Sequence, residues 1–323
     1  MLQLADLYSP IARDIEHAAR LLRDTLISDQ PFLREVCRHV EQFQGKRLRP
    51  ALLLLTARAC GCVRREHHVL AAVVEMVHLA TLVHDDVLDE ADIRRRAATV
   101  NRLWGTERAV LTGDFLFSHA FTLCSSLDSQ FAAQVIGRTA CTLCEGEMMQ
   151  DAHCDNYELS EEEYFDFIER KTASLLGACG LLGAYYAGAD ERTVRRMQQF
   201  GVSLGMAFQI TDDLLDLLGD EAEAGKSLGR DVHKGKMTLP LIHYLRTCGA
   251  QRRQQALALL RGDDPQRYRA IAGLLVDSES VDYAHQLAAT HVATALEILS
   301  ELPPSDARSS LQAMAEFILA RRC

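Results

Sequence analysis

The stretch HVLAAVVEMVHLATLVHDDVLD, residues 68–89, decides the fold. It is rich in alanine, valine and leucine, and its apolar residues recur at intervals of three and four, which predicts a buried α-helix. Residues 52–60, 132–152 and 194–219 show the same composition and spacing. Alternating β-branched residues bounded by hairpin turns are not sustained anywhere, so strands are not expected. The sequence therefore predicts an all-α fold.

Prolines lie at the limits of the expected helices, where they can start or stop one. The seven are Pro10, Pro31, Pro50, Pro240, Pro265, Pro303 and Pro304. No glycine- or serine-rich linker and no repeat of fixed period divides the chain. We therefore expect residues 1–323 to form one domain.

Composition and charge limit the classes of function. With 48% hydrophobic and 25% charged residues, the chain is typical of a soluble globular protein. Its net charge of -10 disfavours a nucleic-acid binder, which needs a surface that neutralises phosphates. The first residues lack a basic start followed by an apolar run, so no secretory signal is expected. The weakly polar stretch 174–189 is shorter than the roughly 20 residues of a membrane span, and we expect a buried helix there and a cytoplasmic protein.

Ten cysteines in such a chain suggest reduced thiols. Cys141 and Cys144 form a C-x-x-C, and with His153 and Cys154 they could supply zinc ligands. The residues between these pairs look helical and would separate them by more than ~12 Å. We therefore favour buried thiols of the core over a zinc site.

The helix of residues 68–89 ends in an acidic cluster, Asp85, Asp86 and Asp89. Asp85 and Asp89 lie about 40° apart on a helix, with Asp86 at the edge of the same face. Like charges four residues apart repel, so the cluster lowers stability unless a partner compensates it. A charge run of this kind is more often a solvated helix face than a site.

A second copy of the spacing changes that interpretation. The segment FQITDDLLDLLGD carries Asp212, Asp213 and Asp216, again at the polar end of an apolar helix. If the two clusters face one another across a cavity, six carboxylates cannot all stay ionised without cations between them. Magnesium binds carboxylate oxygens and completes its shell with water and substrate phosphates. The pattern therefore predicts a magnesium site for a phosphate ester.

Basic motifs could bind the phosphates of such a ligand. They are GKRLRP at 45–50, RRR at 94–96, ERKTAS at 169–174 and GKSLGRDVHKGKMTLP at 225–240. Arginine forks suit bidentate phosphate binding, and lysines act as point charges, although each motif alone is typical of solvated surface. The glycine-rich segment 219–227 is not a P-loop, because five residues separate its glycines and a helix precedes it.

Six motifs in order, GKRLRP, HLATLVHDDVLDEADIRR, GDFLF, ERKTA, FQITDDLLD and GKSLGRDVHKGKMTLP, resemble the trans-polyprenyl diphosphate synthase family over nearly the whole chain. The resemblance is strongest to long-chain members that make octaprenyl diphosphate. It implies a homodimer of helical bundles, each around a central cavity, without a membrane span or nucleic acid. It also implies about three Mg2+ ions per active site, held between the acidic clusters.

The implied reaction joins farnesyl or geranyl diphosphate, an allylic diphosphate, to isopentenyl diphosphate. The allylic diphosphate ionises to a carbocation, the double bond of isopentenyl diphosphate attacks it, and a proton is lost. The polyprenyl product is membrane-seeking and would serve quinone side chains. A dry, shaped cavity protects the cation from water.

The resemblance also implies the role of each site residue. Magnesium ligands would be Asp85, Asp89 and Asp212, supported by Asp86, Asp213 and Asp216. The allylic diphosphate would be bound by Arg94, Lys171, Thr172, Gln209, Lys226 and Lys236, of which Lys171 and Lys236 also count as catalytic. Isopentenyl diphosphate would be bound by Lys46, Arg49, His78 and Arg95. His78 lies within about 20° of Asp85 on the helix, two turns deeper, which suits that role, although a lone histidine is usually a core or rim residue.

Product length would depend on the residues before Asp85. In the family, bulky aromatics four or five positions upstream block the tunnel for the growing chain, whereas here those positions are Thr81 and Ala80. The open tunnel favours products of about C30 to C50, and Met76 is a candidate for its floor. The chain also has Arg96 where close relatives have glycine, which affects the loop conformation, because glycine adopts backbone angles that arginine resists.

Four alternatives stay open. A short-chain farnesyl or geranylgeranyl diphosphate synthase would differ in product length alone. A class I terpene cyclase would have an N/D-x-x-S/T-x-x-x-E motif in place of DDLLD. A non-catalytic helical partner subunit of a heteromeric synthase would have lost an acidic cluster or the basic motifs. A purely structural helical protein would leave two matched acidic clusters unexplained.

Overall fold

The computed structural model describes residues 7–43, 45–219 and 228–320. In these ranges all regular structure is helical except one two-stranded hairpin, which confirms the all-α prediction. The chain divides into two compact units. Unit 1 comprises Met1–Cys141, Leu175–Gly201 and Ile298–Met314, and unit 2 comprises Thr142–Ser174, Val202–Glu297 and Ala315–Cys323. The expectation of one domain stays a prediction.

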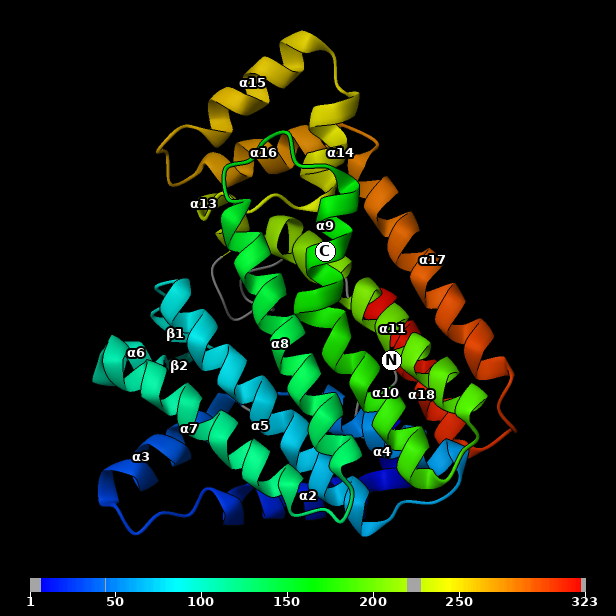
Figure 1. Cartoon of the computed structure of the whole chain (residues 1–323). Helices are drawn as coiled ribbons and strands as arrows, with labels where there is room; N and C mark the ends of the chain where they lie inside the picture. Colours follow the sequence, from blue (N-terminus) through cyan, green and yellow to red (C-terminus); the bar gives the residue numbers. More distant parts are fainter. Residues whose placement is uncertain (1–6, 44, 220–227, 321–323) are drawn as a thin grey trace. The chain divides into compact units, whose positions relative to one another are not determined.

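Unit 1 is organised around a long central helix, α5, against which α2, α4 and α7 pack (Figure 1). Its elements are η1 (Ser9–Ile11), α2 (Ala12–Thr25), α3 (Pro31–Val40), η2 (Glu41–Phe43), α4 (Leu48–Cys60), α5 (Arg65–Leu88), β1 (Ile93–Arg94), β2 (Ala97–Ala98), α6 (Val100–Trp104) and α7 (Thr106–Ser125). Helices α8 (Gln130–Ala152), α10 (Ser174–Ala187), α11 (Glu191–Leu218), α17 (Ser280–Ser300) and α18 (Asp306–Ala320) contribute residues to it as well.

The core of unit 1 forms because α4 and α5 are apolar on nearly every side. Residues 52–55 of α4, all leucines, are completely buried, and each contributes about 1.5–3 kcal/mol by leaving water. Helix α5 starts where the Nδ1 of His67 accepts the backbone N–H of Arg64 at 2.8 Å. By length and composition α5 could cross a membrane, but 78% of its most apolar window is buried, as in a core helix.

Unit 2 contains the remaining elements. They are α9 (Glu161–Ile168), the π-helical turn η3 (Glu169–Ala173), α13 (Arg230–His233), α14 (Leu239–Thr247), α15 (Ala250–Leu260) and α16 (Arg267–Val276). The turn η3 packs tightly against α8 and α11. A Cβ on Gly146 of α8 would lie 2.4 Å from the backbone nitrogen of Lys171, and one on Gly205 of α11 would lie 2.4 Å from the Cα of Ala173. These two glycines allow the close approach that positions η3.

Two sequence expectations need correction. The hairpin β1–β2 was not expected, because two-residue strands are too short to show alternation. Cys141 and Cys144 are exposed rather than buried. Helix α8 runs unbroken from Gln130 to Ala152, as predicted, and the two thiols lie three residues apart on its outward face, while Leu143 and Gly146 face inward.

Candidate active site

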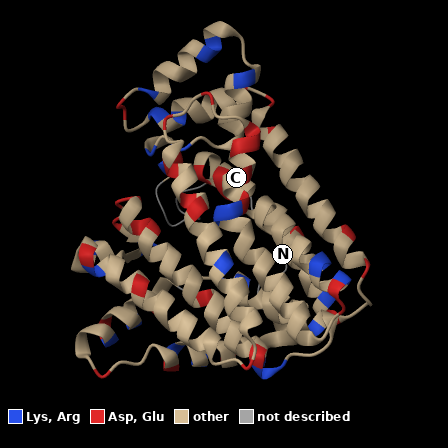
Figure 2. Cartoon of the chain, in the orientation of Figure 1, with Lys and Arg blue, Asp and Glu red and all other residues tan. Residues whose placement is uncertain are grey.

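The first acidic cluster lies at the C-terminal end of α5, where the ribbon of Figure 2 is coloured for acidic residues. Asp85 and Asp86 belong to the last turn, and Asp89 is the cap residue, whose N–H donates to the Asp85 carbonyl at 2.8 Å. Asp86 is only 1% exposed, whereas Asp85 and Asp89 are half-buried. The two half-buried carboxylates are therefore the ones that a ligand can reach.

A hairpin presents the three consecutive arginines. Ile93 pairs with Ala98 and Arg94 with Ala97, which leaves Arg95 and Arg96 as the turn. Their φ angles are 50° and 66°, both in the left-handed region. Two-residue hairpin turns of this type need positive φ at both positions, where glycine and asparagine are favoured. Arg96 thus occupies a position that suits glycine better than arginine.

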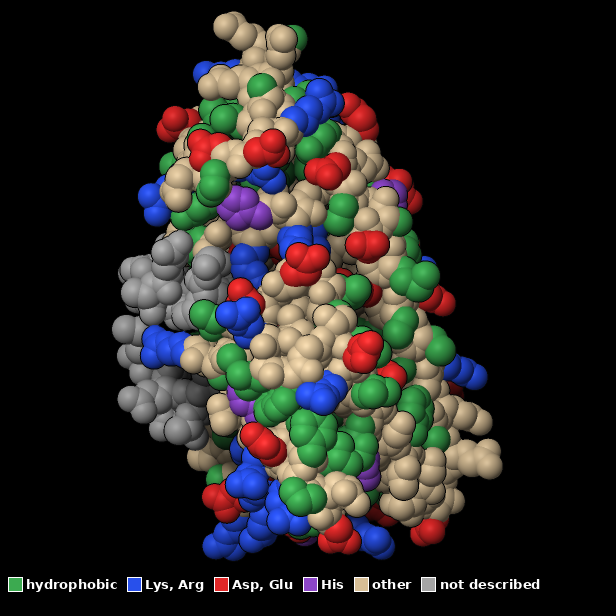
Figure 3. All heavy atoms as spheres, turned by 90° about the vertical axis from the view of Figure 1, so that its left-hand side faces the viewer, with side chains coloured by type: hydrophobic (Ala, Val, Ile, Leu, Met, Phe, Trp, Pro, Cys, Tyr) green, Lys and Arg blue, Asp and Glu red, His purple; other side chains and the backbone are tan. Residues whose placement is uncertain are grey.

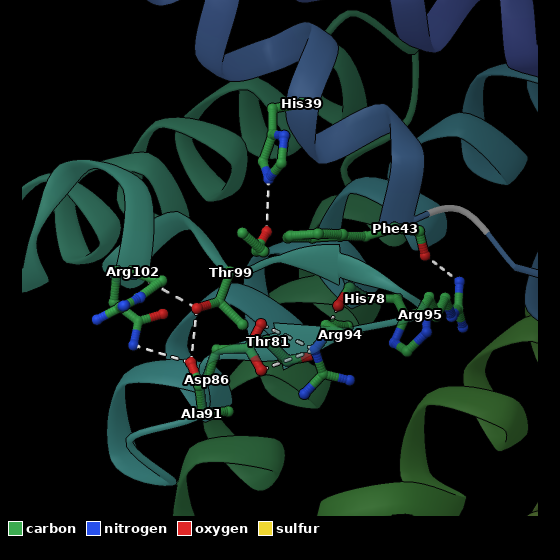
Figure 4. A network of polar contacts seen from close by, with 12 residues as sticks. His39, Phe43, His78, Thr81, Asp86, Ala91, Arg94, Arg95, Thr99 and Arg102 are labelled. Atoms are coloured by element: carbon green, nitrogen blue, oxygen red, sulfur yellow. Dashed lines mark hydrogen bonds and ion pairs between the residues drawn. The ribbon is translucent and has the colours of Figure 1, made fainter. Parts of the chain in front are cut away.

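Arg94 and Arg95 point to opposite sides of the hairpin (Figure 4). The Nε of Arg94 donates to both carboxylate oxygens of Asp86 at 2.8 Å. Thr99 donates its hydroxyl to the carbonyl of Ala91 at 2.6 Å and fastens the loop from the other end. The buried carboxylate of the cluster thereby fixes an arginine that the sequence assigns to diphosphate binding.

Arg95 joins the basic motif 45–50 to the hairpin. Its guanidinium donates to the carbonyl of Phe43, and a Cβ on Gly45 would lie 2.4 Å from the guanidinium carbon. Burial lowers the pKa of His78 well below its usual value, and the charges of Arg49, Arg95 and Arg94 lower it further. His78 therefore lies near these guanidiniums, and the role of this part of the predicted set stays a prediction.

Lys46 is exposed on the turn before α4. Its carbonyl accepts the hydroxyl of Tyr8 at 2.8 Å, which ties that turn to the start of the described chain. The amine lies on the same short segment as Arg49. On the face drawn in Figure 3, basic side chains are interspersed with acidic ones.

The second acidic cluster is organised in unit 2 by a chain of hydrogen bonds. Thr172 donates its hydroxyl to the Oε1 of Gln209 at 2.7 Å, and Gln209 donates its Nε2 to the Oδ1 of Asp213 at 2.7 Å. The hydroxyl of Tyr164 donates to the Oδ2 of Asp213, also at 2.7 Å. Burial raises the pKa of Asp213 well above its ordinary value, and the charge of Asp231 raises it further. Sequence reasoning missed Tyr164, 49 residues away from its partner.

The other carboxylates of this cluster differ in burial. Asp216 is 2% exposed and accepts the N–H of Asp231 on its Oδ2 at 3.0 Å. Its carbonyl accepts the N–H of Gly229 at 2.7 Å. Asp216 thereby anchors the segment that leads into α13. Asp212, in contrast, is half-buried and open to a ligand.

Two of the predicted lysines are described in unit 2, Lys171 in η3 and Lys236 between α13 and α14. Lys171 lies in η3, with its Nζ 2.5 Å from Glu147 Oε2 and 2.8 Å from the Oε1 of Gln150. The backbone N–H of Lys236 donates to the carbonyl of Asp231 at 2.8 Å. Lys226 lies outside the described residues. Lys171 is thus held by an amide and a carboxylate, on a type of turn that is frequent at functional sites.

The carboxylates of the two acidic clusters are potential ligands of a metal ion. Among the described residues, no three His, Cys, Asp or Glu side chains converge closely enough to hold a metal by themselves. Magnesium does not require such a cage, because it is usually bound through one or two carboxylates together with waters and phosphate oxygens. Asp85 and Asp89 in unit 1, and Asp212 in unit 2, each supply hard oxygen donors of that kind, and such donors fit a divalent ion that arrives with a phosphate ligand.

An all-α fold with half-buried carboxylates and clustered guanidiniums is of a class that suits a diphosphate ester bound together with a divalent metal. The sequence profile of the polyprenyl synthetase family matches residues 30–275. The chain belongs to this family, and it is a prenyltransferase of the trans-prenyl diphosphate synthase type.

Known relatives cover nearly the whole chain. A short chain isoprenyl diphosphate synthase of Methanothermobacter thermautotrophicus is 34% identical over 95% of this chain and 96% of its own. An all-trans-nonaprenyl-diphosphate synthase of Rhodobacter capsulatus, described as geranyl-diphosphate specific, is 36% identical over 98% and 97%. The crystal structure of a polyprenyl synthase from Caulobacter crescentus, complexed with calcium and isoprenyl diphosphate, superposes with a TM-score of 0.94 at 33% identity, covering 99% of this chain and 98% of the other.

Proposed function

We propose that this protein is a long-chain trans-polyprenyl diphosphate synthase that adds isopentenyl diphosphate to an allylic primer, farnesyl or geranyl diphosphate. The observation that carries the proposal is the concentration of Arg49, His78 and Arg95 in the unit whose α5 ends in two half-buried carboxylates. Cations and metal-binding oxygens on one short part of the chain are what a metal-bound diphosphate requires.

Asp85, Asp89 and Asp212 are the proposed ligands of Mg2+, with about three ions per active site once substrate is bound. When bound, the metal ions neutralise the departing diphosphate as Lewis acids. Asp86, Asp213 and Asp216 support the ligands from buried positions. The calcium in the Caulobacter crescentus complex is consistent with a divalent ion in the family.

The allylic diphosphate is assigned to the polar groups that the structure holds in fixed positions. Lys171 is oriented by Glu147 and Gln150, and Thr172 by Gln209. Arg94 is fixed by Asp86. The set of proposed ligands is completed by Lys226 and Lys236. Fixed donors stabilise the developing charge on the leaving group without reorganising during the reaction.

Isopentenyl diphosphate is assigned to Arg49, Arg95, His78 and Lys46. Because the pKa of His78 is lowered by burial, its neutral ring can donate one hydrogen bond to a phosphate oxygen without adding a charge. The guanidiniums offer bidentate geometry. This subsite would hold the second substrate while its double bond attacks the allylic cation.

Product length is proposed from α5. Ala80 and Met76 are completely buried, and Thr81 is turned back on the helix, with its hydroxyl donating to the carbonyl of His78 at 2.8 Å. No aromatic side chain stands at either position upstream of Asp85, which favours products of about C30 to C50, centred on octaprenyl. Relatives named for short-chain and for nonaprenyl products are similarly identical to this chain, so a short-chain synthase remains the alternative.

A cytoplasmic homodimer that makes quinone side chains is the proposed biological form. Apolar side chains of α7 remain exposed in the single chain, with Leu111 65%, Val110 40% and Phe121 37% accessible. Leu111 also lines a hollow with Phe32 and Phe115. Exposed apolar side chains of this extent are typical of an interface, which supports association of two copies.

The test is incorporation of radiolabelled isopentenyl diphosphate into farnesyl diphosphate by purified protein. Condensation should require Mg2+ and stop on chelation. Thin-layer chromatography of the dephosphorylated product should give a chain of about C30 to C50. A product of about C15 to C20 would support the short-chain alternative instead. No condensation with any allylic primer would refute the proposed enzyme.

A further inference from the structure

A carboxylate is buried in the middle of α5 that the proposed reaction does not use. Glu75 is the only acid in residues 67–84, and it is 4% exposed between the buried Val74 and Met76. Removing a carboxylate from water is costly unless opposite charges or hydrogen-bond donors compensate it. An apolar side chain would suit such a helix better if burial were the residue's only role.

Three guanidiniums are close enough to this carboxylate to act on its charge. Burial raises the pKa of Glu75, and Arg49, Arg95 and Arg47 oppose that rise, in this order of strength. Arg47 and Glu75 also line the same small hollow with Pro50 of α4 and Ala72 of α5. Glu75 is therefore the counter-charge of the arginines assigned to isopentenyl diphosphate.

Arg49 has one donor, its Nε, that the described residues leave unused. Burial lowers the pKa of Arg49, and the carboxylate of Glu75 is the strongest influence against that. Among the described residues, the buried Nε of Arg49 has no hydrogen-bond partner. A buried charged donor without a partner is costly. The guanidinium of Arg49 is therefore suited to a ligand, and the negative charge of Glu75 compensates it while no ligand is bound.

In the proposed reaction, the charge balance between Glu75 and these arginines affects how the product's diphosphate is released. The C1–O bond of the allylic substrate breaks and its diphosphate leaves, a C–C bond forms to isopentenyl diphosphate, and the released diphosphate takes the lost proton. The product therefore keeps the diphosphate that isopentenyl diphosphate brought in. That diphosphate must leave the arginines before the next unit can bind, and a long-chain synthase repeats this transfer several times.

We propose that Glu75 is a positioning residue that holds Arg47, Arg49 and Arg95 in place while the subsite is empty and limits how tightly they retain the product's diphosphate. This inference rests on the proposed function for the identity of the ligand. The fixed negative charge competes with the diphosphate for the same guanidiniums. Each elongation step then ends in release instead of product inhibition.

The test compares Glu75→Gln with wild-type enzyme. The variant should bind isopentenyl diphosphate and inorganic pyrophosphate about tenfold more tightly by calorimetry, because it lacks a negative charge that competes for the guanidiniums; about tenfold corresponds to two unit charges about 12 Å apart at an effective dielectric of about 20. Its KM for farnesyl diphosphate should stay unchanged, and its products should become shorter. Pyrophosphate should raise its Tm by more than that of wild type, which a merely structural role would not produce. Glu66→Gln, on the same helix, is the matched control and should change none of these values.

Unchanged or weaker pyrophosphate binding by a folded Glu75→Gln would overturn the inference. If that variant does not fold, the double variant Glu75→Gln/Arg47→Gln removes one charge of each sign. Folding of the double variant with wild-type affinity supports the inference, and its failure to fold counts against it. Because pyrophosphate binding needs no condensation, this test gives an answer even if the proposed synthase activity is absent.

Discussion

Replacing Tyr164 by phenylalanine removes one hydroxyl from the second acidic cluster and leaves the ring in place. That hydroxyl donates to the Oδ2 of Asp213 at 2.7 Å, and the two residues are 1% and 6% exposed. A hydrogen bond to a charged group contributes about 1.5–3 kcal/mol, and water cannot easily replace this one. We expect Tyr164→Phe to lose stability of that order whenever Asp213 is ionised.

The same change should weaken metal binding. The hydrogen bond from Tyr164 lowers the pKa of Asp213, while burial raises it. Without the hydroxyl the pKa rises further, and a larger fraction of Asp213 carries a proton at neutral pH. A proton on this carboxylate removes a negative charge next to the proposed ligand Asp212, and so weakens binding of the divalent ion. We expect the Mg2+ concentration for half-maximal condensation to rise about 10- to 100-fold, which corresponds to the hydrogen-bond energy at 1.4 kcal/mol per factor of ten.

The assay is isopentenyl diphosphate incorporation as a function of Mg2+, with thermal denaturation in parallel. The matched control is Tyr283→Phe, because the hydroxyl of Tyr283 donates to a carboxylate oxygen of Glu161 at the same 2.7 Å in the same unit. The control should lose stability but keep its Mg2+ dependence. If both variants show the same Mg2+ dependence, the argument that Tyr164 tunes the acidic cluster is wrong.

Three further changes test other parts of the structure. Ala80→Phe should shorten the product to about C15 to C20. Because Ala80 is completely buried, the same change should destabilise the protein by about 1–3 kcal/mol. An unchanged product length would mean that Ala80 does not line the tunnel. Arg96→Gly should raise the free energy of unfolding by about 1 kcal/mol, because φ there is 66°, whereas Ala97→Gly in the adjoining strand should lower it. In metal-free protein, the free energy of unfolding of wild type relative to Asp213→Asn should fall as pH rises from about 5 to about 8. The reason is the raised pKa of Asp213: over this range the folded state holds a proton that the unfolded state has lost. Urea unfolding across that range measures the difference, and a parallel pH dependence of the two proteins would contradict it.

Periodicity predicted the helices well because a buried helix repeats its apolar residues every three or four positions over many turns. Helices α5, α8 and α11 follow their predicted segments closely. The hairpin β1–β2 could not be predicted, because its strands have two residues each and its turn places arginines at positive φ. The π-helical turn η3 is too short to change the apolar spacing of the helical segment that contains it, so periodicity did not predict it. The outward face of α8 was assigned wrongly, since small residues on several faces left its inner side undefined.

Contacts between distant segments were also beyond the reach of the sequence. Tyr164 and Asp213 lie on different helices, and nothing in the local pattern of either marks the other as a partner. The meeting of Arg95 with Gly45 depends on how α5 and its hairpin lie against the turn before α4. The sequence could predict which residues carry the chemistry, but how deeply each of them is buried depends on packing.

The extent of burial differs between residues at equivalent positions of the two acidic clusters. In the first cluster the middle carboxylate is buried and bound by Arg94, while Asp85 and Asp89 are half-buried. In the second cluster Asp213 and Asp216 are buried, and Asp212 is half-buried. The pattern D-D-x-x-D therefore does not assign equal roles to equal positions.

The consequence concerns how loss of activity should be interpreted in either cluster. Each buried carboxylate accepts hydrogen bonds from a specific donor, as Asp86 does from Arg94 and Asp216 from the backbone of Asp231. Removing such a carboxylate leaves a buried donor unsatisfied and costs about 1–3 kcal/mol of stability, so an inactive variant there need not have lost a metal ligand. Asp89 and Asp212 are half-buried, and their removal leaves the protein interior largely unchanged. Loss of activity with unchanged stability at these two positions identifies a metal ligand, and the same loss at Asp86 does not.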